Sequence, residues 1–225
     1  MSLHPLKRTD LNKSWNHGRA GTKIKMAPEY QLIITEGTAT EPAYFAAVSD
    51  IVNRSFPDKI HVKVEGKGKN TLSLLNSALN SVRRNQNDIK HVWIVFDTDD
   101  FSVSDINRTA DLCTKYSCEE TTYHAIWSNQ CIEFWYLLHF GYYQTDIHRT
   151  RYFDKLTYWL KTLGQGEYSK NRTDMFYILR PYLDIALENA ERLEKVNKGR
   201  TPAESAPGTM VHHLIKHLRN YIIDK

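Results

Sequence analysis

Acidic residues follow three of the four segments that the sequence predicts to be β-strands. Glu36 comes directly after the first apolar run, and Asp97 and Asp99 come directly after the third. Glu133 lies in the first turn of the helix predicted after the fourth strand. An Asp-x-Asp at a strand end places both side chains on the same side of the chain. Carboxylate oxygens are hard ligands, which select Mg²⁺ or Mn²⁺ over softer metals.

Carboxylates that lie within a few ångströms of one another repel. A divalent cation relieves that repulsion and can activate a phosphate group or a water molecule as a Lewis acid. A single Asp-x-Asp is weak evidence, because turns are rich in aspartate, and Glu36 alone also fits a solvated turn. The combination of Glu36, Asp97, Asp99 and Glu133 at one predicted sheet edge indicates a divalent-metal site.

Three lysines are candidates for contacts with phosphate. Lys67 and Lys69 lie in a Gly-Lys-Gly-Lys loop before a predicted helix, where backbone amides can also bind an anion. The glycine spacing is not that of a Walker A loop, and an ordinary flexible connection is the alternative. Lys170 can neutralise charge that develops on a phosphate, or it is a solvated loop lysine.

The late histidines do not have the spacing of a known zinc motif. His213 and His217 have i, i+4 spacing without the glutamate of H-E-x-x-H, and His212 adjoins them. Core or surface roles are therefore favoured over metal binding. The three cysteines also lack the paired spacing of a zinc site or a disulfide framework.

Strand and helix signals alternate in the first two thirds of the chain, without hairpin signals. The pattern predicts an α/β fold with a mostly parallel four-stranded sheet flanked by helices. The carboxyl ends of parallel strands meet at one edge, where ligands bind. Strands are expected at 30–35, 59–64, 91–96 and 121–127, and helices at 40–53, 71–84, 104–116, 131–140, 183–197 and 209–223.

Composition divides the chain into three predicted parts. Residues 1–28 form a basic irregular arm, 29–142 an α/β core, and 143–225 a helical C-terminal extension packed on that core. Hydrophobic residues make up 41% and charged residues 25%, which is typical of a globular protein. The net charge of +4 does not by itself establish nucleic-acid binding. No apolar stretch is long enough for a membrane span, so a cytoplasmic location is expected.

Three segments resemble the motifs of the RloB family. They are T-E-G at 35–37 with T-E-P-A-Y-F at 40–45, F-D-T-D-D-F at 96–101, and the long segment 128–140, and the resemblance covers roughly 30–215. The family is regarded as related to the Toprim fold of topoisomerases, primases and overcoming-lysogenization-defect nucleases. The resemblance implies a Toprim-like sheet, Glu36 as catalytic acid or base, Asp97 and Asp99 as Mg²⁺ ligands, and Glu133 as an added ligand. Gln130, where the family often has proline, and Thr38-Ala39 depart from the pattern and leave the substrate open.

The leading hypothesis is a Mg²⁺- or Mn²⁺-dependent nuclease acting on nucleic acid in antiphage or restriction-associated defence. Glu36 and Lys170 are expected to be catalytic, Asp97, Asp99 and Glu133 to bind metal, and Lys67 and Lys69 to bind substrate. The alternative is a non-catalytic effector or interaction module controlled by a partner ATPase of the AAA or ABC type, because family members often lie beside such a gene. A different phosphotransfer reaction is a third possibility, and DNA, RNA and tRNA all stay open as substrates.

Overall fold

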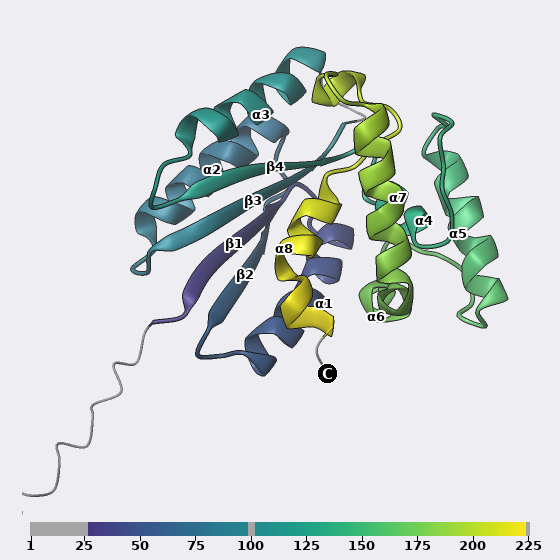
Figure 1. Cartoon of the computed structure of the whole chain (residues 1–225), viewed down its shortest axis with the longest axis horizontal. Coiled ribbons are helices and arrows are strands. Elements are labelled where there is room, and N and C mark those ends of the chain that lie inside the picture. Colours follow the sequence, from purple (N-terminus) through teal and green to yellow (C-terminus); the bar gives the residue numbers. More distant parts are fainter. Residues whose placement is uncertain (1–26, 99–101, 224–225) are drawn as a thin grey trace, which may run out of the picture.

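Four parallel strands form one sheet at the centre of the molecule (Figure 1). The computed structural model describes residues 27–98 and 102–223, so nearly all of the predicted arm, and Asp99, lie outside the described residues. The strand order is β2-β1-β3-β4, and every neighbouring pair is parallel. The strands are β1 (Glu29–Thr35), β2 (Ile60–Gly66), β3 (Ile89–Asp97) and β4 (Thr122–Ser128). The predicted α/β fold with its parallel sheet is confirmed.

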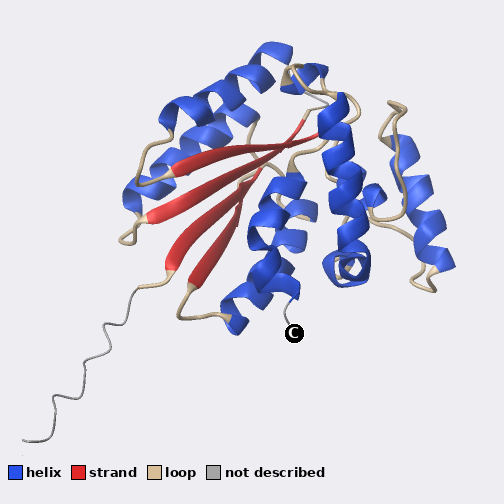
Figure 2. Cartoon of the chain, in the orientation of Figure 1, coloured by secondary structure: helices blue, strands red, loops and turns tan. Residues whose placement is uncertain are grey.

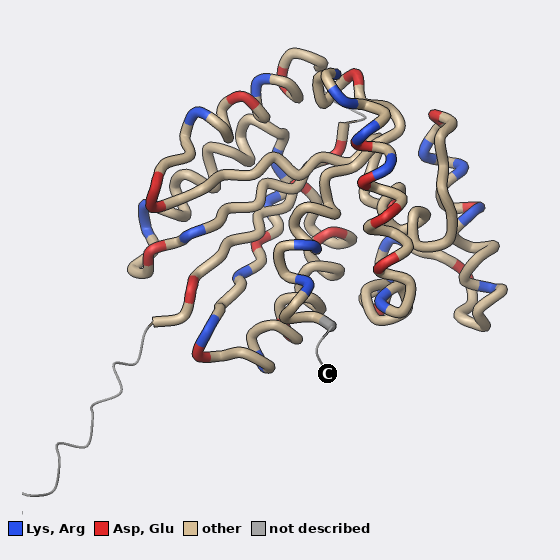
Figure 3. The backbone as a smooth tube through the Cα atoms, viewed as in Figure 1, with Lys and Arg blue, Asp and Glu red and all other residues tan. Residues whose placement is uncertain are grey.

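Helices cover both faces of the sheet, as Figure 2 shows in blue. The crossover helices are α1 (Thr40–Ser55), α2 (Thr71–Arg84) and α3 (Val103–Tyr116). The helices after the last strand are α4 (Glu133–Leu138), α5 (Thr150–Thr162), α6 (Met175–Leu179), α7 (Leu183–Val196) and α8 (Val211–Ile223). Positive and negative residues are interspersed along α3, α5 and α7 (Figure 3).

Alternate residues of β1, β3 and β4 enter two separate hydrophobic cores, whereas β2 contributes to one of them. Leu32 and Ile34 of β1 pack with residues of α2 and α3 on one face. Ile33 of β1 and Trp93 of β3 pack on the other face, with residues from α1 and from α4 to α8. Because successive strand side chains point to opposite faces, continuous apolar runs are required when both faces are covered.

The apolar segment after β4 forms a shorter helix than its composition predicts. The expected helix over 131–140 is helical only from Glu133 to Leu138. The amides of Phe134, His139 and Phe140 each bond to the carbonyl three residues earlier, which tightens both ends of the helix. The first turn therefore begins at Glu133, and its side chain lies next to the end of the sheet.

One buried hydrogen bond ties α1 to α4. The indole Nε1 of Trp135 donates to the hydroxyl of Tyr44 at 2.9 Å, and both side chains are at most 1% exposed. The Tyr44 ring also packs on the rings of Tyr136 and Phe176, with centroid distances of 5.2 and 5.4 Å. These contacts fix the first turns of the two helices relative to each other.

The C-terminal segment returns to the sheet. The helix α8 packs on α1 and β4, and α7 packs on α4 and α8. Before α8, Met210 donates to the carbonyl of Trp127 at 2.8 Å, and the hydroxyls of Ser128 and Thr209 lie 2.8 Å apart. Within residues 27–98 and 102–223, no helix combines the length and the apolar character that a membrane crossing requires.

Replacing Tyr44 by phenylalanine tests the link between α1 and α4. The change leaves the buried indole N–H of Trp135 without its acceptor, which costs about 1–3 kcal/mol of unfolding free energy. Urea unfolding measures the change, and Tyr158→Phe, at a residue 65% exposed, is the matched control with a change near zero. Equal stability of the two variants would show that this hydrogen bond does not anchor the helices.

Candidate functional site

A pocket of about 440 Å³ lies at the carboxyl edge of the sheet. The ends of β1 and β3, the first turns of α1 and α4, and the loops after β2 and before α6 enclose it. Its charged lining consists of Glu36, Glu41, Asp97, Glu133, Lys69 and Lys170. Three of the four predicted carboxylates are therefore brought together, and the fourth, Asp99, lies outside the described residues.

Glu36 and Asp97 are placed side by side by the register of the sheet. Thr35 pairs with Val95, and the amide of Glu36 donates to the Val95 carbonyl at 2.9 Å. The amide of Asp97 in turn approaches the carboxylate of Glu36 at 3.4 Å. Both residues stand where β1 and β3 end, because parallel strands bring their carboxyl ends to the same edge.

Glu41 completes the acidic lining, and sequence reasoning assigned it no role beyond the start of a helix. The amide of Gly37 donates to its carboxylate at 3.2 Å, and the residue is only 6% exposed. A Cβ at position 37 would lie on this carboxylate, so a larger residue there would have to displace the Glu41 side chain. The position of Glu41 in the sequence could have predicted this, because the first turn of the helix after β1 lies at the same sheet edge as Glu36.

Glu133 is held in the pocket wall by a tyrosine from a distant loop. It is 1% exposed, and its Oε1 accepts a hydrogen bond of 2.7 Å from the hydroxyl of Tyr168. Burial, and next the negative charge of Glu133, raise the pKa of Tyr168, so the tyrosine stays a donor. The hydroxyl of Tyr136 is buried without a hydrogen-bond partner among the described residues, and burial raises its pKa too.

The carboxylates perturb one another electrostatically. Burial raises the pKa of Asp97 well above its usual value, and Glu41, Glu133 and Glu36 raise it further, while Lys170 opposes them. Burial also raises the pKa of Glu41, with Glu133 adding to the effect. Hydrogen bonds from the backbone amides of Glu41 and Gly37 counteract part of that rise. Burial and mutual repulsion therefore disfavour full ionisation of the cluster, and Lys170 offsets only part of this effect.

Lys170 reaches the pocket on the loop between α5 and α6. Arg172 organises this loop, because its guanidinium donates to the carbonyls of Gln165 and Glu167 and pairs with Asp174 at 2.7 Å. The hydroxyl of Thr40 donates to the carbonyl of Lys170 at 3.0 Å, which ties the loop to the start of α1.

The two lysines of the Gly-Lys-Gly-Lys loop are separated by the fold. Lys69 lines the pocket, and its ammonium donates to Ser77 at 3.2 Å. Lys67 lies outside the pocket lining and pairs with Glu65 at 2.7 Å. Gly68 between them has a φ of +60°, and this turn sends the two side chains to different places.

The donor set of the pocket fits a hard divalent cation. All its acidic donors are carboxylate oxygens, which suit Mg²⁺ or Mn²⁺. Within the described ranges, no three of these carboxylates bring one oxygen each within 4.8 Å of one another. Mg²⁺ usually keeps several waters and bonds directly to one or two carboxylates, so the spacing fits such a partly hydrated ion.

Gln130, the departure from the family pattern, has a structural role beside the site. Its side-chain oxygen accepts a hydrogen bond of 2.9 Å from the amide of Arg149, just before α5. The hydroxyl of Tyr152 in α5 approaches the carbonyl of Asn129 at 3.3 Å. The turn that leads into Glu133 is therefore braced by α5.

Asp97→Asn is expected to stabilise the metal-free protein at alkaline pH. A carboxyl whose pKa is raised on folding binds a proton more tightly in the folded state, so stability falls as pH rises from about 4 toward the raised pKa. The variant removes this loss and should raise the melting temperature at pH 8 by about 2–4 °C, or about 1 kcal/mol, with little change at pH 4. Thermal unfolding with a chelator measures it.

Two further measurements make this prediction specific. Mg²⁺ should raise the melting temperature of the wild type at pH 8, and Asp97→Asn should abolish the response. Asp50→Asn, at an exposed pair with Arg54 in α1, is the control and should behave as the wild type. A lower melting temperature for Asp97→Asn at pH 8 would contradict the repulsion inferred from the geometry.

Comparison with known proteins places the chain in a family. Searches of curated proteins and of solved structures found no match. A family model described as RloB-like protein matches residues 31–218, from the first strand of the sheet to α8. The match includes Glu36, Glu41, Asp97, Glu133 and Lys170, all of which line the pocket. Because it covers most of the sequence, the chain belongs to the RloB-like protein family.

Proposed function

We propose that this protein is a divalent-metal-dependent nuclease that hydrolyses phosphodiester bonds of nucleic acid. The observation that carries the proposal is the convergence of four carboxylates and Lys170 in one pocket at the carboxyl edge of a parallel sheet. Such edges bind ligands in open α/β folds, and carboxylate clusters of this kind serve phosphoryl transfer with Mg²⁺. The three motifs resemble those of the RloB family, which is regarded as related to the Toprim fold, and this relation supports the same reaction.

The acidic residues divide into two roles in this proposal. Asp97 and Glu133 are the metal ligands, with Glu41 next to them, and Asp99 is a further candidate by sequence. A divalent ion bound here would supply Lewis-acid activation of the phosphate. Glu36 moves the proton, either from the attacking water or to the leaving oxygen, because it lies at the end of β1 beside Asp97. Tyr168 holds Glu133 in its orientation through the hydrogen bond of 2.7 Å.

The lysines of the pocket serve the substrate. Lys170 is exposed and already acts electrostatically on Asp97 and Glu41, so it can neutralise charge on a bound phosphate. Lys69 lines the same pocket and is placed for a neighbouring phosphate. The volume of about 440 Å³ is within the range of small-molecule sites and suits one nucleotide unit. A role in phage defence and a partner ATPase belong to this proposal through the family resemblance, and a cytoplasmic setting is part of it.

Cleavage assays with single variants test the proposal. We expect Asp97→Ala and Glu36→Gln to lower the cleavage rate at least about 100-fold, because each removes a metal ligand or the proton-transfer group. Lys170→Ala should lower it about 10- to 100-fold through lost charge neutralisation. Lys67→Ala is the matched control and should keep full activity, since Lys67 pairs with Glu65 outside the pocket.

The assay needs a panel of substrates and a binding measurement. Single- and double-stranded DNA, RNA and tRNA are incubated with Mg²⁺ or Mn²⁺, with and without an ATPase encoded beside the gene. Calorimetry of Mg²⁺ binding to the wild type and Asp97→Ala accompanies it. Undiminished cleavage by Asp97→Ala would refute the proposed site. Tight ATPase binding with no cleavage of any substrate would favour the interaction module.

A further inference from the structure

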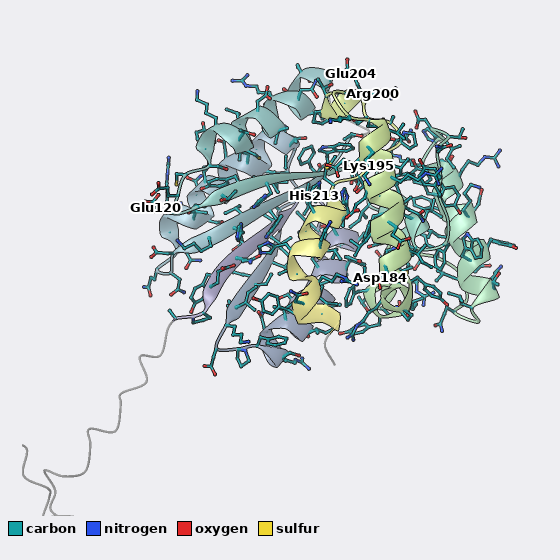
Figure 4. The ribbon with its side chains drawn as sticks, viewed as in Figure 1. Glu120, Asp184, Lys195, Arg200, Glu204 and His213 are labelled. Carbon is teal, nitrogen blue, oxygen red and sulfur yellow. The ribbon has the colours of Figure 1, made fainter. Side chains whose placement is uncertain are left out.

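A second group of possible metal ligands lies outside the acidic pocket, where α7 meets the start of α8. It consists of Glu194 near the end of α7 and of His212 and His213 in the first turn of α8. One ligand atom from each residue lies within 4.8 Å of the other two. Figure 4 labels His213 at the start of α8 and Lys195 on the neighbouring α7.

The glutamate bridges the two imidazoles. The Nε2 atom of His212 lies 2.9 Å from one carboxylate oxygen of Glu194, and the Nε2 atom of His213 lies 2.9 Å from the other. His212 is 1% exposed, whereas the side chains of His213 and Glu194 are 49% and 39% exposed. The group therefore has a buried inner member and two members that solvent reaches.

The tautomer of His212 follows from its second nitrogen. Its Nδ1 lies 3.0 Å from the carbonyl oxygen of Thr209, and a carbonyl oxygen only accepts, so Nδ1 carries a proton. The Nε2 atom then faces Glu194 either with a lone pair or as part of an imidazolium. A lone pair would face a carboxylate oxygen at 2.9 Å, which is repulsive unless a cation lies between them.

We propose that Glu194, His212 and His213 form a Zn²⁺-binding site. Imidazole nitrogen and carboxylate oxygen are ordinary zinc ligands. Histidine ligands usually donate their other ring N–H to a carbonyl or carboxylate, which is the arrangement of His212 with Thr209. Three protein ligands leave a fourth tetrahedral position for water or an anion, and a pocket of about 360 Å³ adjoins the group. Lys195 and Lys198 also line that pocket and favour an anion, whereas Lys216 pairs there with Glu191.

Among the described residues, the other group of possible metal ligands has no unsatisfied acceptor that a cation would relieve. Glu29, His91 and His217 also lie within 4.8 Å of one another. The side-chain amide nitrogen of Gln31 lies between them, 2.6 Å from Glu29 and 2.8 Å from His217, and its oxygen accepts from Trp93 at 2.9 Å. The amide hydrogens already satisfy both acceptors, so no cation is needed there. His217 is consequently the matched control for the zinc site.

The proposed ion would join α7 to α8 next to the end of the sheet. Thr209, whose carbonyl orients His212, contacts Ser128 at the end of β4 through a hydroxyl pair at 2.8 Å. Zinc binding should therefore stabilise the docking of the C-terminal helices. This site is independent of the proposed nuclease activity, because its ligands do not line the acidic pocket.

Zinc calorimetry on full-length, chelator-treated protein tests the site. We expect one Zn²⁺ per chain, a higher melting temperature with Zn²⁺, and visible absorption bands of tetrahedral Co²⁺ when Co²⁺ replaces it. Glu194→Gln and His213→Ala should each weaken Zn²⁺ binding at least about tenfold, since each removes a ligand. His217→Ala should bind as the wild type, and excess Mg²⁺ should not compete.

Two kinds of result would overturn the proposed zinc site. Absence of saturable binding to the wild type would overturn the proposal, and NMR of His212 with both nitrogens protonated would then identify an ion pair with Glu194. Binding kept by both variants, or lost in His217→Ala to the same degree, would place zinc elsewhere and also overturn it. His213 is half-exposed, so its replacement by alanine leaves no buried cavity. The His213→Ala variant therefore tests the site even if the Glu194→Gln variant does not fold.

Discussion

Repulsion among buried and half-buried carboxylates is the constraint on which the candidate active site depends. Four acidic side chains share one pocket, and burial and mutual repulsion together raise the pKa of Asp97. An arrangement of this kind costs folding free energy in the absence of a cation. Proteins keep such strain where function uses it, and the use proposed here is the binding of a divalent ion.

The rest of the fold is arranged to hold these groups in place. The Tyr44–Trp135 hydrogen bond joins the helix that carries Glu41 to the helix that carries Glu133. The hydroxyl of Tyr168 donates to the carboxylate of Glu133, and Arg172 holds the loop that carries Tyr168 in place. The site is therefore built from the ends of two strands, the first turns of two helices and two loops, of which the loop before α6 is braced. This combination suits a pocket that positions charge while leaving an entrance for a large substrate.

The strands, the parallel sheet and the edge at which acidic residues gather were determined by the sequence alone. Runs such as 92–96 are apolar at every position, and only strands covered on both faces require that. Helix signals between the runs then dictate parallel crossovers, and parallel crossovers put Glu36, Asp97 and Glu133 at one edge. Each of these steps depends on local pattern and on a general rule of topology, so it needs no knowledge of packing.

Side-chain partnerships were decided only by the tertiary structure. Glu41 is a first-turn helix residue by pattern, and the close approach of Gly37 is what turns its carboxylate toward the pocket. Lys67 and Lys69 are two residues apart, yet only Lys69 lines the pocket, because the chain turns at Gly68 and Glu65 pairs with Lys67. His212 and His213 meet Glu194 only because α7 packs on α8. Spacing along the chain cannot reveal ligands that come from two helices, since packing alone sets their distance.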